Sequence, residues 1–315
     1  MQRYSLSSMA ALLLGLAAVT AACGSDDSNN TPANQDAGAD VGSDGAVVGN
    51  GCNFGEPNNT RETATAIELN TLYKSVCVSG AGDTADFYEI TAPNDAAGGL
   101  VELQLSNVST NGLPQVAVTA SSDNGSVFSH YTTDEGSNLN LWFTVAAGAK
   151  YKLKVDRFAG DEPRYTYDLN LKYTKINDSF EPNDVKADAK DIVVGTPIQA
   201  SASGNGPNGG DLPSKAYEDW YKVALGAGAS VVTMSNVPAD YLCKVTVLDP
   251  AGNEVGQNYS TTEGANCKVT LEATAAAGTY YVNVQPFALS PARANYGTTV
   301  PDSQTKQYTL LVSAP

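Results

Sequence analysis

The feature that most restricts the fold of this chain is an internal repeat. Glu56-Pro57-Asn58-Asn59 opens one copy, and Glu181-Pro182-Asn183-Asp184 opens the second. Each copy continues with an acid, an aromatic residue and a tyrosine, in Asp86-Phe87-Tyr88 and in Asp219-Trp220-Tyr221. The repeat predicts two similar folded units. We place them at residues 52–173 and 177–315.

Both copies are predicted to consist of β-strands. Apolar and polar residues alternate with a period of two in several segments, which are 101–105, 150–155, 167–173 and 280–285. Such alternation places the apolar side chains on one face of a strand and the polar ones on the other. Turn-forming residues separate these segments, as in 123–125 and 249–252. We therefore expect an all-β protein with two tandem antiparallel β-sandwiches.

The N-terminus predicts export. Arg3 precedes an apolar run over residues 9–19, which is about half the ~20 residues that a membrane-spanning helix needs. Residues 1–22 are therefore expected to be a signal peptide. Residues 24–50 contain five Asp and no Lys or Arg among small polar residues. Such a composition predicts a disordered acidic linker over 23–50, which holds the folded part away from the membrane.

The residues around Cys23 predict a lipid anchor. Thr20-Ala21-Ala22-Cys23 resembles the lipobox of bacterial lipoproteins, although Thr20 stands where a leucine is usual. The resemblance implies that cleavage before Cys23 is coupled to its acylation. The chain is then anchored to the cell envelope, and Gly24 favours the outer membrane by resemblance to known sorting rules. The alternative is a cleaved signal followed by an unmodified cysteine.

Charge and cysteine content restrict the partners and the compartment. The chain has 18 basic and 34 acidic side chains, a net charge of -16, which argues against a nucleic-acid partner. Four cysteines follow Cys23, an even number that fits an oxidising compartment. Three pairings are possible in principle, and their spacing favours one bridge within each copy. The sequence has one histidine and no Cys-x-x-Cys pair, which argues against zinc. The predicted bridges are Cys52–Cys77 and Cys243–Cys267.

The repeated motifs, in their order, resemble the bacterial pre-peptidase C-terminal domain. This domain is a small jelly-roll-like β-sandwich that is appended to many secreted proteases and collagenases. The resemblance covers 52–173 and 177–315. It implies a non-catalytic module, since some members of the family bind collagen or insoluble polymers.

Three functions are weighed from the sequence. The first is a non-catalytic, lipid-anchored envelope protein that binds an extracellular polymer or protein through exposed aromatic residues; the candidates are Tyr131, Tyr165, Tyr259 and Tyr281. The second is a structural spacer or assembly subunit without a ligand of its own. The third is a carboxylate-dependent hydrolase, for example with Asp83 and Asp86 as its pair. His130, the one imidazole, lacks a nucleophile motif.

The acids and amides of the repeated motifs are candidate calcium ligands. Calcium takes six to eight oxygen ligands, and a short acidic segment beside the start of a strand can supply several. In the family, some collagen-binding members use matching positions. Both copies lack the further acid of that pattern, because Phe54 and Ser179 stand in its place, and Lys215 stands where the first copy has Asp83. The candidates are Glu56, Asn58, Asn59, Asp83 and Asp86 in the first copy and Glu181, Asn183, Asp184 and Asp219 in the second. The alternative is that Asn58 and Asn183 cap a turn after the proline and that the acids accept backbone N–H groups, without a metal.

Overall fold

The structure is a computed structural model, and it describes residues 47–49, 51–79, 84–121, 128–159, 164–202, 218–272, 275–287 and 299–314. The predicted signal peptide, Cys23 and nearly all of the predicted linker lie outside these residues. The described residues form two β-sandwiches, each with its own hydrophobic core.

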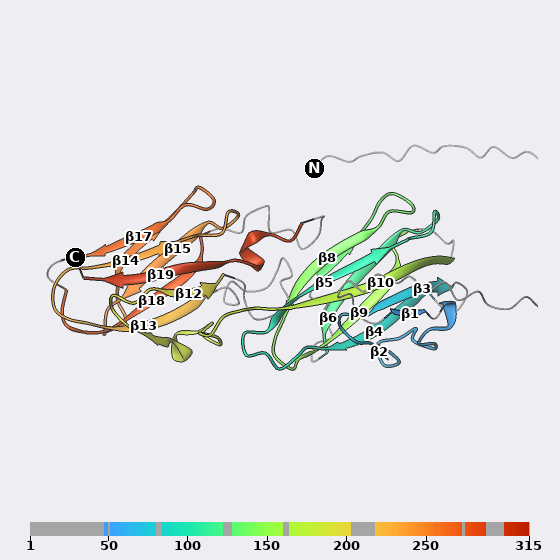
Figure 1. The fold of residues 1–315 in the computed structure, drawn as a ribbon, viewed down its shortest axis with the longest axis horizontal. Helices are drawn as coiled ribbons and strands as arrows, with labels where there is room; N and C mark the ends of the chain where they lie inside the picture. The colour runs from blue at the N-terminus through green and yellow to red at the C-terminus, as the bar shows by residue number, and fades with distance from the viewer. Residues whose placement is uncertain are drawn as a thin grey trace, which may run out of the picture. The chain divides into compact units, whose positions relative to one another are not determined.

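The first sandwich consists of two five-stranded sheets (Figure 1). One sheet has the order β1 (Val47–Gly49), β3 (Leu72–Ser79), β10 (Arg164–Lys175), β5 (Gly99–Ser106), β8 (Leu139–Val145). The other has the order β2 (Thr65–Ala66), β4 (Ala85–Thr91), β9 (Lys150–Arg157), β6 (Pro114–Ala120), β7 (Phe128–Tyr131). A 3₁₀ turn, η1 (Gly51–Asn53), follows β1. The short strand β1 pairs parallel with β3, and β2 pairs parallel with β4. The remaining pairs are antiparallel.

The second sandwich repeats this topology. Its five-stranded sheet has the order β11 (Lys190–Ile192), β13 (Asp219–Leu225), β18 (Gly278–Pro286), β15 (Cys243–Leu248), β16 (Glu254–Tyr259). Its four-stranded sheet has the order β12 (Ile198–Ser201), β19 (Gln307–Ser313), β14 (Ser230–Ser235), β17 (Cys267–Leu271). The 3₁₀ turns are η2 (Lys186–Asp188) and η5 (Asp302–Gln304). Strand for strand, β4, β9, β6 and β7 correspond to β13, β18, β15 and β16.

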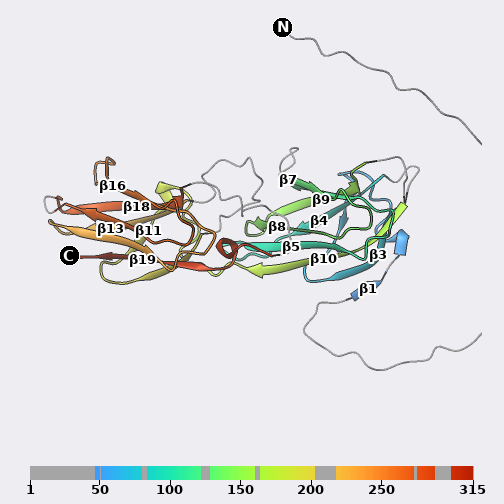
Figure 2. The same cartoon turned by 90° about the horizontal axis from the view of Figure 1, so that it is seen from above.

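Alternation of side chains explains why each sandwich has a dry interior. In β9 the residues Tyr151, Leu153 and Val155 are buried, whereas the lysines between them lie on the outer face. In β18 the buried residues are Tyr280, Val282 and Val284. Figure 2 shows the two layers of each sandwich, between which these side chains pack. The predicted all-β fold and the antiparallel sheets are thus confirmed, whereas the predicted domain boundaries stay a prediction.

Both predicted disulfides are present, and they connect different kinds of elements. Cys52–Cys77 joins the η1 turn to β3. Cys243–Cys267 joins β15 of one sheet to β17 of the other. Two disulfides are typical of a protein from an oxidising compartment. In the part of the chain that the structure describes, no helix is long and apolar enough to cross a membrane.

Candidate functional site

The repeated Glu-Pro-Asn motif forms the same turn in both sandwiches. The Glu56–Pro57 and Glu181–Pro182 peptide bonds are cis. The backbone N–H of Asn58 donates to Glu56 Oε2 at 3.2 Å, and that of Asn183 donates to Glu181 Oε2 at 3.0 Å. The backbone carbonyl of each asparagine then accepts a hydrogen bond from the second motif. The Phe87 N–H donates to Asn58, and the Trp220 N–H donates to Asn183, both at 2.9 Å. The two sequence motifs of each copy are therefore one structural unit.

The acid of the second motif lies inside the first sandwich. Asp86 is fully buried, and its Oδ2 atom accepts hydrogen bonds from the hydroxyls of Tyr167 at 2.5 Å and Tyr88 at 3.2 Å. The two hydroxyls lie 2.9 Å apart. Because β4 carries Asp86 and Tyr88 while β10 carries Tyr167, this group joins the two sheets through the core.

The second sandwich repeats the group. Asp219 Oδ2 accepts from the Tyr308 hydroxyl at 2.5 Å, and the hydroxyls of Tyr221 and Tyr308 lie 2.7 Å apart. Burial raises the pKa of both tyrosines well above the usual range. These buried hydrogen bonds hold two sheets together. The Asp86 carboxylate has no exposed surface on which a substrate could meet it, and its proposed partner Asp83 lies outside the described residues.

The second sandwich has a buried carboxylate that sequence reasoning missed. Asp178 precedes the repeated motif, and its two oxygens accept the backbone N–H groups of Phe180 at 2.8 Å and Ser201 at 2.5 Å. The sequence does contain an acid three residues before Glu181. The calcium-binding pattern of the family places its acid only two residues before that glutamate. Burial raises the pKa of Asp178 above the usual range.

Around Asp178 the acids influence one another. Burial raises the pKa of Glu181 to about 8, and the charges of Asp184 and Asp178 add to this shift. Burial and the charge of Glu181 also raise the pKa of Asp219. Such shifts are typical of carboxyl groups that are buried close to one another without a cation. Each of these acids also accepts a hydrogen bond: Glu181 from Asn183, Asp178 from Ser201 and Asp219 from Tyr308.

The predicted calcium ligands are only partly brought together. Glu56, Asn58 and Asp86 belong to one unit in the first sandwich, and both side-chain polar atoms of Asn58 are buried without a hydrogen-bond partner among the described residues. The Asn59 Oδ1 atom is also buried in this way. No three acid, histidine or cysteine side chains of the described residues are grouped closely enough to hold a metal ion. Asp83 and Lys215 lie outside those residues.

Two of the four candidate aromatic residues occupy equivalent exposed positions. Tyr131, at the end of β7, is 41% exposed and stacks on Phe158 with ring centroids 3.6 Å apart and planes 4° apart. Tyr259, at the end of β16, is 49% exposed and stacks on Phe287 at 4.1 Å and 7°. The two phenylalanines are 40% and 41% exposed. Each sandwich therefore presents the same Tyr–Phe pair at one corner of a sheet.

The other two candidates are placed differently. Tyr165 is 1% exposed, and its hydroxyl donates to the carbonyl of Asp156 at 2.8 Å. The prediction of an exposed Tyr165 was wrong, because Tyr165 shares the inward face of β10 with Tyr167. Tyr281 is partly buried, and the Lys186 Nζ atom lies 4.2 Å from its ring centroid. That ring face is engaged in a cation–π contact.

A second repeated motif builds the Tyr–Phe corners, and sequence reasoning missed it. Residues 131–138 and 259–266 share the pattern Tyr-x-Thr-x-Glu-Gly-x-Asn. Gly136 and Gly264 adopt φ of 73° and 71°, and a Cβ atom there would lie 3.2 or 3.3 Å from the Cα atom of the facing loop. These glycines allow the turn that returns the chain past each tyrosine. The signal was available in the sequence as a match of five positions in eight.

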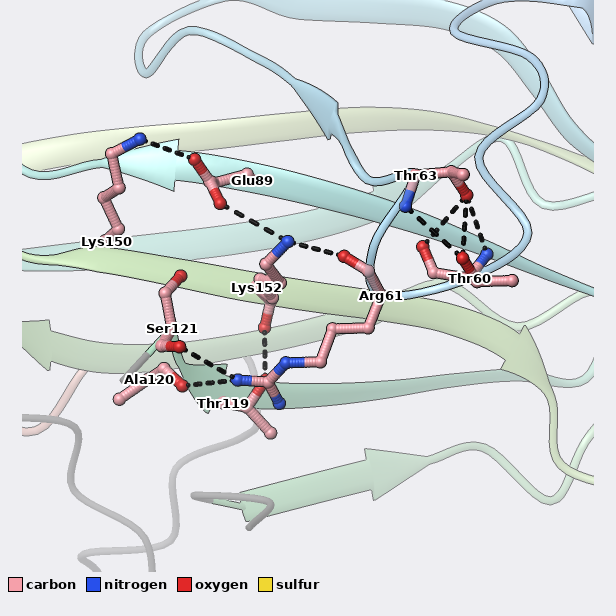
Figure 3. A network of polar contacts seen from close by, with 9 residues as sticks. All are labelled: Thr60, Arg61, Thr63, Glu89, Thr119, Ala120, Ser121, Lys150 and Lys152. Carbon is pink, nitrogen blue, oxygen red and sulfur yellow. Dashed lines mark hydrogen bonds and ion pairs between the residues drawn. The ribbon is translucent and has the colours of Figure 1, made fainter. Parts of the chain in front are cut away.

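The outer face of the first sandwich carries a charged strip, which we define as Arg61, Glu89, Lys150 and Lys152 (Figure 3). Glu89 accepts from Lys150 at 2.8 Å and lies 3.4 Å from Lys152. The Arg61 guanidinium lies at the C-terminal end of β6 and donates to the carbonyls of Ala120 at 2.9 Å and Ser121 at 3.3 Å. These contacts fix the strip as a network of ion pairs and backbone hydrogen bonds.

Comparisons with known proteins gave matches among solved structures alone. No known protein family matches the chain, and no curated protein matches it. Among solved structures, the pre-peptidase C-terminal domain of a collagenase from Bacillus anthracis is 24% identical, with 35% of this chain and 94% of that chain covered and a TM-score of 0.28. Tripeptidyl peptidase 2 is 10% identical over 78% of this chain and 27% of that chain, with a TM-score of 0.31. The CUB1-EGF-CUB2 domain of human MASP-1/3 is 10% identical over 75% and 98%, with a TM-score of 0.20.

Proposed function

We propose that this chain is a non-catalytic, lipid-anchored protein of the bacterial cell envelope whose sandwiches bind an extracellular polymer or protein. The observation that carries the proposal is the exposed Tyr–Phe pair at the same corner of both sandwiches. Rigid aromatic rings give a large contact area at a small loss of side-chain entropy, and they are enriched where proteins bind partners.

The duplication makes a purely structural role for these rings a poor explanation. The core of each sandwich is closed by other residues, and the Tyr–Phe pairs lie outside both core clusters. Each pair places two exposed aromatic rings in contact, where a partner could cover them. The buried positions of Asp86 and Asp219 also support a binding role over a carboxylate-dependent hydrolase.

The binding proposal is tested by a pull-down with the full mature chain. Isolated cell-surface polymers and envelope proteins are the probes, and the double variant Tyr131→Ala/Tyr259→Ala is compared with the natural chain. We expect capture of at least one probe and its loss in the double variant. Val193→Ala, which changes another exposed apolar residue (66% exposed), is the matched control. Equal capture by all three proteins contradicts the assignment to the Tyr–Phe pairs.

The envelope anchor is a separate part of the proposal. It is supported by the lipobox-like sequence before Cys23 and by two disulfides, which fit an oxidising compartment. Detergent-phase partitioning measures it: the natural chain is expected in the detergent phase, and Cys23→Ser is expected to release the chain or to stall its processing. Membrane retention of the serine variant contradicts the lipid anchor.

We further propose calcium as the ion for the Glu-Pro-Asn turns. In the first sandwich Glu56, Asn58, Asn59 and Asp86 would hold it together with Asp83. In the second, Glu181, Asn183, Asp184 and Asp219 would hold it. Bound calcium would neutralise the carboxylates and stabilise the turn. The natural chain is titrated with calcium chloride in a calorimeter, and Glu56→Gln and Glu181→Gln are titrated as separate variants. We expect the natural chain to give a heat of binding and one of the two variants to lose it. No heat at millimolar calcium contradicts the proposal.

A further inference from the structure

The outer face of the β11-β13-β18-β15-β16 sheet differs from the rest of this acidic protein. The strand register places two neighbouring rows of polar and aromatic side chains on this face, beside a third row of Lys222, Tyr281 and Leu248. One row is Trp220, Asn283, Thr246 and Gln257, and the next is Gln285, Lys244 and Tyr259. We call these seven residues and Phe287 the amide face. Phe287 follows β18 and stacks on Tyr259. Amide and hydroxyl groups thus lie between an indole at one side and the Tyr–Phe pair at the opposite corner.

The amide face carries no excess charge. Its one cation is Lys244. Glu218, the residue before β13, borders it and accepts from the Trp220 Nε1–H at 3.0 Å and from the Asn283 Nδ2 group at 3.4 Å. These bonds fix the orientation of the indole and of the buried amide. Asn283 and Thr246 are only 3% and 8% exposed, so a ligand at this face meets mainly the aromatic rings, Gln257, Gln285 and Lys244. Lys222 of the neighbouring row is paired with Asp191 at 3.3 Å.

This chemistry selects one class of ligand. Carboxamides both donate and accept hydrogen bonds, as hydroxyl groups do, and an aromatic ring covers the apolar C–H face of a sugar. A polyanion would be repelled by a chain of net charge -16. We infer that the amide face of the second sandwich binds a neutral polysaccharide. This inference rests on the proposed binding function and names its ligand class.

The span of the face fits a polymer better than a single sugar. Trp220 lies on β13 and Tyr259 on β16, three strand spacings apart, which is roughly 14 Å across the sheet. A chain of several sugar units can contact both aromatic groups at once. A monosaccharide can contact only one of them and is expected to bind weakly.

The first sandwich has the same Tyr–Phe pair, but the outer face of its corresponding sheet carries different side chains. Its corresponding rows hold Lys154 and Asp156, which form an ion pair, where the second sandwich holds Asn283 and Gln285. Phe87 stands in the place of Trp220. An ion pair takes up the donors and acceptors that a neutral sugar would need. The first sandwich is therefore expected to contribute less to polysaccharide binding.

Affinity electrophoresis tests the inference. The full mature chain is run in native gels that contain a neutral glucan or mannan, the anionic polysaccharide alginate, or gelatin. We expect retardation by at least one neutral polysaccharide, and a loss of affinity of at least about tenfold in both Tyr259→Ala and Gln285→Ala/Gln257→Ala. The amide variant changes partly exposed side chains, so it tests the face even where an aromatic variant disturbs folding. Tyr131→Ala is expected to change affinity less than about threefold, and Val193→Ala not at all.

The outcomes separate this inference from the proposed function. Retardation by alginate or gelatin alone overturns the polysaccharide inference and leaves a binding protein. Retardation by a neutral polysaccharide that survives in both Tyr259→Ala and the amide variant overturns the assignment to this face. A larger loss in Tyr131→Ala than in Tyr259→Ala overturns the role given to the second sandwich. No retardation by any probe, together with no capture in the pull-down, overturns both proposals.

Discussion

The two sandwiches fasten their leading segments in different ways at the same place. In the first, Cys52 in η1 is bonded to Cys77 of β3. In the second, the Asp178 carboxylate accepts the backbone N–H of Ser201 in β12. The positions correspond, because Cys77 faces Thr166 in β10 and Ser201 faces Gln307 in β19, each one residue before the buried tyrosine of that strand.

This difference indicates that the leading segment must be attached to the sheet at this position, but that either a disulfide or a carboxylate hydrogen bond can attach it. Both attachments hold the Glu-Pro-Asn turn against the sheet, and the turn itself is the same in both copies. A disulfide depends on the redox state and not on pH, whereas a carboxylate attachment depends on pH and not on reductant. The two leading attachments should therefore fail under different conditions.

The largest expected effect comes from the covalent attachment. Cys52→Ser/Cys77→Ser opens a loop of 25 residues, for which chain-entropy reasoning gives a loss of about 3 kcal/mol in the free energy of unfolding. Hydrogen exchange on the full chain is expected to quicken in β3 and β10, with β12 and β19 unchanged. The control is Cys243→Ser/Cys267→Ser, which should act on the second sandwich instead. Equal acceleration in both sandwiches would argue against independent attachments.

The carboxylate attachment is expected to have the next largest effect. Asp178→Ala leaves the N–H groups of Ser201 and Phe180 without their acceptor, and an unsatisfied buried donor lowers the free energy of unfolding by about 2 kcal/mol. Asp178→Asn keeps one acceptor oxygen and should lower it less. Hydrogen exchange in β12 is the measurement. An alanine variant that exchanges as slowly as the natural chain would show that the attachment contributes nothing.

The pH dependence of the second sandwich separates the copies further. Glu181 has a folded-state pKa of about 8 against 4.5 for the ordinary group. A carboxyl whose folded pKa is raised contributes stability that is complete below the lower value and is lost as the pH rises through the higher one. The second sandwich should therefore become less stable between pH 4.5 and pH 8.

Glu181→Gln tests this sign. Glutamine cannot ionise, so the pH-dependent loss between pH 4.5 and pH 8 should become smaller in the variant, as followed by hydrogen exchange in β13 and β19. Glu56→Gln is the matched change in the first sandwich and should leave the exchange of β13 and β19 unaltered. A natural chain whose second sandwich gains stability over this pH range would contradict the buried position of Glu181.

The smallest expected effect concerns the charged strip. The Glu89 side chain is 21% exposed, and Lys150 is 57% exposed. Surface ion pairs of this kind contribute about 0.5 kcal/mol or less to stability. Glu89→Gln should therefore shift the melting temperature of the first sandwich only slightly. A loss comparable to that of the Cys52→Ser/Cys77→Ser variant would mean that the strip, and not the leading attachment, holds this sandwich together.

Local patterns in the sequence predicted much of the architecture. Alternation identified the inward faces of β9, β10 and β18, and the repeated motifs identified the positions of the turn and of the acid in each copy. The disulfide partners followed from their spacing. The role of the acids did not follow, because an Asp that binds an ion and an Asp that accepts tyrosine hydroxyls look alike in sequence.

The sequence alone determined the properties that depend on neighbours along the chain: which residues form strands, which face of each strand is apolar, and the acidic charge of the protein. The tertiary structure decided which side chains from different strands meet. It stacked Phe158 on Tyr131, buried Tyr165 and brought Asp178 to Ser201. Strand order and register set these contacts, and both are fixed by the packing of a whole core, which no short segment contains.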